Sequence, residues 1–372
     1  MSKSIKTMAV LLMTWLVSTP ASAWSLKEHI LMTRVAAERL IADPNTPADM
    51  KEWLKAANRT GSDMDGEKKF FLHQRVGLYP RGVDGLGFWA VIPDLEKLSN
   101  GPVKANIAPF GIPESSLHFT DAELLNPAQE KHTFKDDLSS KPKLEEVSKD
   151  MADPAWKKAG MLPFRVADVY KKLVDVIRAG KLNDKNGQYP RDEHAEHWAG
   201  FLAHYLEDNT QPHHATIDFN SKSYFAKSTG RSPGIHGNVE GLLMDDDHED
   251  YMHLREEFWP IFVKALDEVK DPATSNEPWQ ATVEVMLYSY DYLPLIGRAA
   301  QAGYKIGGTA TEPAGAPAAK IDADAFFHVK MNVHDVEISM MEMKAQQMAL
   351  GVKRVQRVWL QAWNEAHQPA RD

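Results

Sequence analysis

Apolar positions recur at three- and four-residue steps along most of the chain, which is the pattern of helices with one buried face. The segment 194–207, for example, places Trp198, Phe201, Leu202 and Tyr205 at this spacing. Strict alternation of apolar and polar residues, the sign of half-buried strands, is scarce. The expected helices are 25–41, 164–179, 194–207, 239–244, 258–269, 278–300 and 325–366.

This pattern predicts an all-α protein built as a single multi-helix domain over residues 24–372. Long Gly- and Pro-rich loops are expected at 61–113 and 215–234. Residues 309–320 are rich in Ala, Pro and Gly. They are either a linker before a C-terminal helical extension over 320–372, expected to be a helical hairpin, or a surface excursion within one domain.

Residues 1–23 have the features of a secretory signal peptide. Lys3 and Lys6 give a positive start, residues 8–17 are apolar, and Ala21 and Ala23 give a small-x-small cleavage pattern. The apolar run is too short to span a bilayer. Cleavage after Ala23 would make Trp24 the first residue of a secreted or periplasmic protein.

Composition narrows the chemistry of any site. The chain has 372 residues, no cysteine and 15 histidines, so thiolate nucleophiles and thiolate metal sites are excluded and a metal must be bound by nitrogen and oxygen. The formal charge is −9, and loss of Lys3 and Lys6 with the signal peptide leaves −11. An acidic surface repels polyanions at long range, which disfavours non-specific nucleic-acid binding.

Histidine–carboxylate pairs at helical i, i+4 spacing are the main candidate metal ligands, because such a pair can face one ion. There are five pairs, His132/Asp136, His204/Asp208, His214/Asp218, His236/Glu240 and His253/Glu257, where chance predicts about two. His204/Asp208 is favoured because it ends the clearest helix and is followed by Gln211, Pro212, His213 and His214. The proline ends the helix and turns the chain back. His197 lies almost two turns before His204 and is expected on the same face.

An ordered series of short motifs resembles the zinc-dependent phospholipase C and S1/P1 nuclease superfamily. The series consists of an N-terminal tryptophan followed by a histidine, an aromatic–Ala segment ending in aspartate, the Leu-His-Phe-x-Asp motif, H-x3-D followed by Gln-Pro-x-His, and a final H-x3-E. In this chain its residues are Trp24, His29, Asp94, His118, His204, Asp208, His214, His236 and Glu240.

The resemblance implies three zinc ions. Asp94, His118, His204 and Asp208 would hold one, and His214, His236 and Glu240 a second. The third would be held by His29, the amino terminus and carbonyl of Trp24, and a bridging Asp208. Asp94 is also expected to orient or deprotonate the attacking water, with Asp63 and Asp65 as alternative early carboxylate ligands.

The resulting functional hypothesis is a secreted phospholipase C that cleaves the phosphodiester of phospholipids through metal-activated water and contacts membrane surfaces transiently, as a monomer. Glu240 in the last pair favours the phospholipases, since the nucleases usually carry aspartate there. The 22-residue spacing from His214 to His236 is more typical of the nucleases, so a single-strand nuclease is the alternative. A non-catalytic periplasmic zinc-binding protein is a further alternative.

Overall fold

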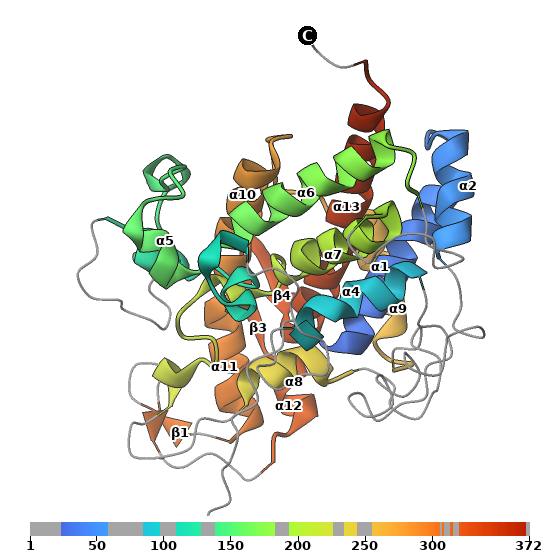
Figure 1. The fold of residues 1–372 in the computed structure, drawn as a ribbon. Helices are drawn as coiled ribbons and strands as arrows, with labels where there is room; N and C mark the ends of the chain where they lie inside the picture. The colour runs from blue at the N-terminus through green and yellow to red at the C-terminus, as the bar shows by residue number, and fades with distance from the viewer. Residues whose placement is uncertain are drawn as a thin grey trace, which may run out of the picture.

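The computed structural model describes residues 24–58, 85–96, 109–127, 138–182, 193–225, 234–243, 255–305, 307–308, 313–314 and 320–369. The expected signal peptide, residues 1–23, lies outside them. The described part is mostly helical, which confirms the all-α prediction (Figure 1). Among the described helices, none has both the length and the apolar character needed to cross a membrane.

Twelve α-helices form the described part of the chain. They are α1 (Leu26–Ala42), α2 (Ala48–Ala57), α4 (Gly85–Glu96), α5 (Pro154–Ala159), α6 (Leu162–Arg178), α7 (Ala195–Asp208), α8 (Ile235–Gly241), α9 (Trp259–Glu268), α10 (Pro278–Tyr290), α11 (Leu293–Gly303), α12 (Ala323–Phe327) and α13 (Met340–Ala366). Short 3-10 turns join them, namely η2 (Pro109–Gly111), η3 (Glu114–Leu117), η4 (Ala122–Leu125), η5 (Leu144–Glu146), η6 (Pro212–Ala215) and η7 (Lys222–Tyr224). Two small antiparallel ladders pair β1 (Gly307–Gly308) with β2 (Pro313–Ala314), and β3 (Lys330–Val333) with β4 (Val336–Ser339).

Helix α7 lies at the centre of the bundle. It packs against α1, α4, α6 and α13, and all of its 14 residues are buried (Figure 1). Gly200 lets α4 approach closely, because a Cβ at this position would lie 2.4 Å from the Cβ of Trp89. Since α7 has no solvent face, its polar residues lie inside the protein and need polar partners there.

Helix α13, near the C-terminus, packs mainly against four other helices of the bundle. A capping box of Ser339 and Glu342 starts the helix, and its buried residues join the same core as α1, α6, α7 and α9. Lys344 reaches from α13 to Glu28 on α1, with 2.6 Å between its Nζ and the Oε1 of Glu28, and both side chains are fully buried. The C-terminal helix is thus packed into the body that contains α7.

Two of the predicted boundaries were wrong. Residues 85–96, expected within a loop, form α4, whose residues 85–95 are buried in spite of Pro93. Residues 330–339, expected to be helical, form the β3–β4 hairpin, because His334 and Asp335 both adopt the positive φ that a tight hairpin turn requires.

The predicted helix 278–300 is divided in two. The chain leaves α10 at Tyr290, and α11 begins at Leu293 with Pro294 in its first turn. Proline lacks the N–H that a helix interior needs and is tolerated in the first turn. Of the expected linker 309–320, only residues 313, 314 and 320 are described.

Candidate metal centre

Three groups of buried histidine and carboxylate side chains are close enough to hold metal ions, with the ligand atoms of each group within 4.8 Å of one another. Together they contain eight of the nine predicted ligands. The groups are His29, Asp94 and His204; His118, His204 and Asp208; and His214, His236 and Glu240.

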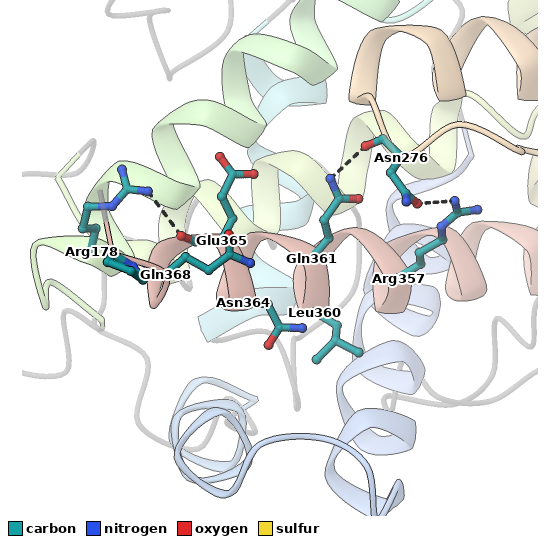
Figure 2. Close-up of a pocket in the computed structure, with 9 residues that line it drawn as sticks. Arg178, Asn276, Arg357, Leu360, Gln361, Asn364, Glu365 and Gln368 are labelled. Atoms are coloured by element: carbon teal, nitrogen blue, oxygen red, sulfur yellow. Dashed lines mark hydrogen bonds between the residues drawn. The ribbon is translucent and has the colours of Figure 1, made fainter. Parts of the chain in front are cut away.

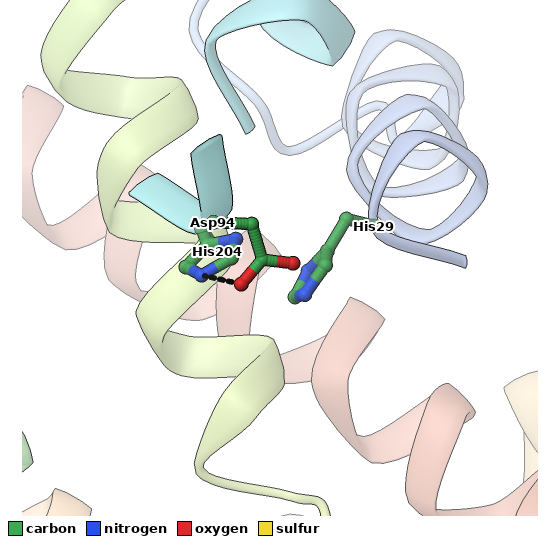
Figure 3. Close-up of side chains that lie close together, drawn as sticks. All are labelled: His29, Asp94 and His204. Carbon is green, nitrogen blue, oxygen red and sulfur yellow. Dashed lines mark ion pairs between the residues drawn. The ribbon is translucent and has the colours of Figure 1, made fainter. Parts of the chain in front are cut away.

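The first two groups form one cluster between α1, α4 and α7. The Asp94 carboxylate from α4 projects between His29 on α1 and His204 on α7, and its Oδ1 lies 3.7 Å from the Nε2 of His204 (Figure 3). His118, just after η3, comes within 3.8 Å of the same oxygen through its Nδ1. Residues separated by up to 179 positions in the sequence therefore surround one small volume.

Asp208 faces two sides of this cluster. Its Oδ2 lies 2.9 Å from the Nδ1 of His118 and 3.2 Å from the Nε2 of His204, while its Oδ1 lies 3.2 Å from the Nε2 of His29. One carboxylate oxygen is thus directed at each neighbouring group. This arrangement is suited to a carboxylate that bridges two ions.

The third group lies beyond the end of α7. Pro212 redirects the chain into η6, which carries His214, and the Nδ1 of His214 donates to the carbonyl oxygen of His118 at 2.6 Å. On α8, the Nε2 of His236 lies 2.5 Å from the Oε1 of Glu240. Gln211 donates its side-chain amide to the same Glu240 oxygen at 3.0 Å and so orients this carboxylate.

Four of the five histidines share one arrangement: Nδ1 is hydrogen-bonded to an acceptor outside the groups, and Nε2 is left to face the group. Outer acceptors of this kind fix the tautomer and orientation of metal-binding histidines in proteins. A carbonyl oxygen cannot donate, so a ring nitrogen bonded to one must carry the proton. The Nδ1 contacts are His29 to Glu207 Oε2 at 2.6 Å, His204 to Ala90 O at 2.8 Å, His214 to His118 O at 2.6 Å, and His236 to Phe219 O at 3.1 Å. His118 is reversed, with Nδ1 facing inward and Nε2 4.0 Å from Glu114.

The electrostatics of the cluster fit a cation. Burial lowers the pKa of His29, with the neighbouring His204 contributing, and thereby favours the neutral imidazole that coordinates metals. The carboxyl groups of Asp94 and Asp208 are 3 % and 0 % exposed, and buried carboxylates require a paired charge or a metal. The chemistry of the donor set, imidazole nitrogen with carboxylate oxygen, fits zinc and other first-row divalent ions.

Trp24, the ninth predicted ligand, lies fully buried against the end of α7. Its indole N–H donates to the carbonyl oxygen of Glu207 at 2.9 Å. Ser25 follows it as the N-cap of α1, with Glu28 completing a capping box. The side chain of Trp24 thereby holds the start of the described chain next to the residue that precedes Asp208.

A cavity of about 240 Å³ opens beside the third group. Its lining combines imidazoles with apolar side chains. The lining residues are Ser115, His118, Phe119, Asp121, His213, His214, Thr216, Ile217, Phe219 and His236. Three of the candidate ligands, His118, His214 and His236, therefore line this cavity.

No protein-family model and no curated protein matches this chain. The interpretation of the site therefore depends on its geometry and donor chemistry. Membership of the zinc-dependent superfamily that the motifs resemble stays a prediction.

Some candidate residues are placed outside the three groups. His197 stacks on Phe201 with ring centroids 4.2 Å apart, and His213 contacts the hydroxyl of Ser221 at 2.9 Å. Asp218 accepts from Ser223 in a local turn, so the pair His214/Asp218 does not act as one unit. Asp63, Asp65, His132, Asp136 and His253 lie outside the described residues.

The sequence interpretation missed Glu207. This fully buried carboxylate holds the Nδ1 of His29 at 2.6 Å and accepts from the hydroxyl of Thr33 at 2.9 Å. Glu207 is three residues after His204, so the two side chains are neighbours on the surface of a helix, and this spacing is the feature of the sequence that could have indicated Glu207. What the spacing could not show is that α1 packs on that part of α7.

A second hollow, of about 800 Å³, runs along the C-terminal half of α13 (Figure 2). Three of its polar side chains donate to nearby protein groups. Arg357 donates to the side chain of Asn276, Gln361 donates to the Asn276 carbonyl, and Arg178 donates to the Glu365 carbonyl. None of the eight grouped metal-site side chains, all of them in the described part of the chain, lines it.

Proposed function

We propose that this protein is a zinc-dependent phosphodiester hydrolase of the phospholipase C type that binds three zinc ions. The observation that carries the proposal is the convergence of eight side chains from distant segments, in which four of the five histidines have their Nδ1 bonded to an acceptor outside the groups. Structural histidines satisfied in a core do not need this common orientation around buried carboxylates. The order of the motifs along the chain resembles that of the zinc-dependent phospholipases C and S1/P1 nucleases, and it supports the same functional proposal.

In this proposal the ligands are divided among three ions, and the first two geometric groups are divided so that His29 shares an ion with Asp208 instead of with Asp94 and His204. Asp94, His118, His204 and Asp208 hold one, and His214, His236 and Glu240 hold the second. His29 and the second oxygen of Asp208 hold the third, together with the amino group and carbonyl of Trp24 once residues 1–23 are removed. Bound zinc would supply a water with lowered pKa and would stabilise the phosphate oxygens during displacement.

The residues of this chain position the reactants. Asp94, buried between His29 and His204, is assigned the role of accepting the proton of the attacking water. Gln211 fixes Glu240, and Glu207 fixes His29, so that the ligand set is pre-organised. The buried location keeps bulk water from the Asp94 carboxylate.

The lining of the neighbouring cavity favours a phospholipid over a nucleic-acid strand as the proposed substrate. The ten lining residues, all described, include no Lys or Arg, whereas single-strand grooves carry cations that follow the phosphate backbone. A single-strand nuclease is the second candidate, because the rings of Phe119 and Phe219 in the lining offer a stacking surface for a base.

Asp208→Asn tests the proposal. The variant keeps the size of the side chain but loses the charge that faces two groups. We therefore expect loss of bound zinc and a fall in turnover of more than about a hundredfold, which exceeds the cost of changing a hydrogen-bond partner of a metal ligand. Zinc per chain is measured by mass spectrometry. Turnover is measured on phosphatidylcholine, on single-stranded RNA and on bis(p-nitrophenyl) phosphate, with and without a chelator.

Asp267→Asn is the matched control, because that carboxylate is 67 % exposed and pairs only with a surface arginine in the described structure. Three zinc ions and full turnover in Asp208→Asn would refute the site. Tight zinc binding by the unsubstituted protein without hydrolysis of any of the three substrates would favour a non-catalytic zinc-binding protein. Chelator-sensitive cleavage of RNA alone would select the nuclease.

A further inference from the structure

Two large apolar side chains are exposed at the mouth of the cavity beside the candidate metal centre. Ile217 is 42 % exposed and Phe219 is 38 % exposed, and both line the cavity. They belong to residues 216–224, a segment that begins two residues after His214, and we refer to it as the rim loop. Exposed apolar residues are common singly, but a pair at the mouth of a site is a candidate contact surface.

The rim loop is held by polar contacts that leave these two side chains outside. At its start, the hydroxyl of Thr216 donates to Glu123, and the backbone N–H of Ile217 donates to the same carboxylate at 3.3 Å. Between the two apolar residues, Asp218 turns inward and accepts from the backbone of Lys222 at 2.7 Å and of Ser223 at 3.0 Å.

The far side of the rim loop is joined to the metal-ligand helix α8. The carbonyl of Phe219 accepts from the Nδ1 of His236 at 3.1 Å, and the side-chain oxygen of Asn220 accepts from the His236 backbone N–H at 3.1 Å. The exposed position of Phe219 is therefore fixed relative to a candidate ligand. The ring is also covered on one side by the ammonium group of Lys222, 5.4 Å from its centroid.

The cavity and rim together suit a molecule with two chemical parts. His118, His214 and His236 form a wall toward the candidate metal ligands, which suits an anionic phosphodiester. Phe119, Ile217 and Phe219 contribute apolar side chains to the lining, and Ile217 and Phe219 are also exposed at the surface. An aliphatic side chain beside the ring favours hydrocarbon over a flat base, because stacking proteins use aromatic surfaces for that purpose.

We propose that Ile217 and Phe219 insert into the surface of a phospholipid bilayer and contact the acyl chains of the lipid whose phosphodiester enters the cavity. This inference rests on the proposed hydrolase function for the orientation of the lipid. It goes further in assigning a membrane-contact surface to two named side chains. Apolar burial rather than net charge supplies the attraction, in keeping with the acidic composition of the chain.

The test is the double variant Ile217→Ser/Phe219→Ser. A control with closely matching exposure is Trp259→Ser/Val263→Ser, since these α9 side chains are 40 % and 38 % exposed and do not line the cavity. Binding is measured by co-sedimentation of the zinc-loaded protein with vesicles of a non-hydrolysable phosphonate analogue of phosphatidylcholine, so that turnover does not enter the measurement. We expect the rim variant to bind vesicles about tenfold or more weakly than the unsubstituted protein, and the control to bind within twofold.

A second measurement compares vesicle hydrolysis with cleavage of soluble bis(p-nitrophenyl) phosphate. The ratio of the two rates should fall about tenfold in the rim variant and stay constant in the control. Equal vesicle binding by the rim variant and the unsubstituted protein would overturn the inference. So would cleavage of the soluble diester without vesicle binding, which would leave the hydrolase proposal standing. Rim-dependent vesicle binding without cleavage of any diester would support the membrane contact and refute the hydrolase.

Discussion

The buried ion pair between Lys344 and Glu28 gives a quantitative test of how the C-terminal helix is joined to the candidate metal centre. All three protons of the Lys344 ammonium group are used. Its Nζ lies 2.6 Å from the Glu28 carboxylate, 2.6 Å from the carbonyl oxygen of Glu240 and 2.5 Å from that of Leu242. Lys344 thus connects α13 with α1 and with the end of α8.

Replacing Lys344 by Met keeps most of the side-chain volume and removes the charge. Burial raises the pKa of Glu28 and lowers that of Lys344, and the ion pair opposes both shifts. Without Lys344, the Glu28 carboxylate stays fully buried and two carbonyl oxygens lose their donor. Breaking one side of a buried pair costs about 3–5 kcal/mol, so we expect the free energy of unfolding to fall by that amount.

Urea unfolding of the metal-free protein at neutral pH measures this cost without the stabilisation that ions add. Lys344→Met/Glu28→Gln should recover part of the loss and retain a deficit of about 1–3 kcal/mol from the unsatisfied carbonyls. Lys264→Met is the control, because Lys264 and its partner Glu268 have side chains that are 71 % and 65 % exposed. Loss of this surface pair should change the free energy of unfolding by less than about 0.5 kcal/mol. A loss below about 1 kcal/mol in Lys344→Met, or no recovery in the double variant, would refute the reasoning.

Two further predictions follow from buried and capping carboxylates. Glu207→Gln should weaken zinc binding about 10–100-fold, because Glu207 orients His29, and competition with a chelating dye measures this; an unchanged affinity would contradict the assigned orienting role. Glu342→Gln should cost about 0.5–1 kcal/mol at pH 7 by weakening the capping box with Ser339. Because the backbone N–H of Ser339 lowers the pKa of Glu342, this stabilisation is complete above the ordinary value of 4.5 and is lost as the pH falls through the lower folded value. Denaturation curves of the two proteins should therefore converge in acid, and a constant difference down to pH 2 would argue against an ionised cap.

Pairs of candidate ligands at i, i+4 spacing lie close together in the structure where a regular helix runs through both residues. His204 and Asp208 are brought together because α7 is a regular helix through both, and His236 and Glu240 are brought together by α8. The pair His214/Asp218 has the same spacing but lies after Pro212, where the chain is no longer a regular helix. Spacing alone could not separate these cases, and the order of the motifs along the chain was needed.

The sequence predicts the helical class of the fold, but it predicts the bounds of the individual helices and strands less well. Segment 85–96 was expected to be a loop because of its glycines and Pro93, yet burial against α1 and α7 makes it the helix that carries Asp94. Local propensity gives no information on such packing. The hairpin at 330–339 was missed for a related reason, since its turn depends on positive φ at the non-glycine residues His334 and Asp335.

The outer partners of the histidines are the part of the site that the sequence could least reveal. Ala90 and Phe219 act through their carbonyl oxygens, so any side chain could occupy these positions without changing the contact. Their contribution depends on where α4 and the rim loop lie relative to α7 and α8. The same packing places Asp94 and Asp208 in the interior, where a bound cation would offset the cost of burying their charges. Under the proposed function, metal binding therefore adds to the stability of the packed helices α1, α4 and α7, and their packing in turn holds the ligands in place.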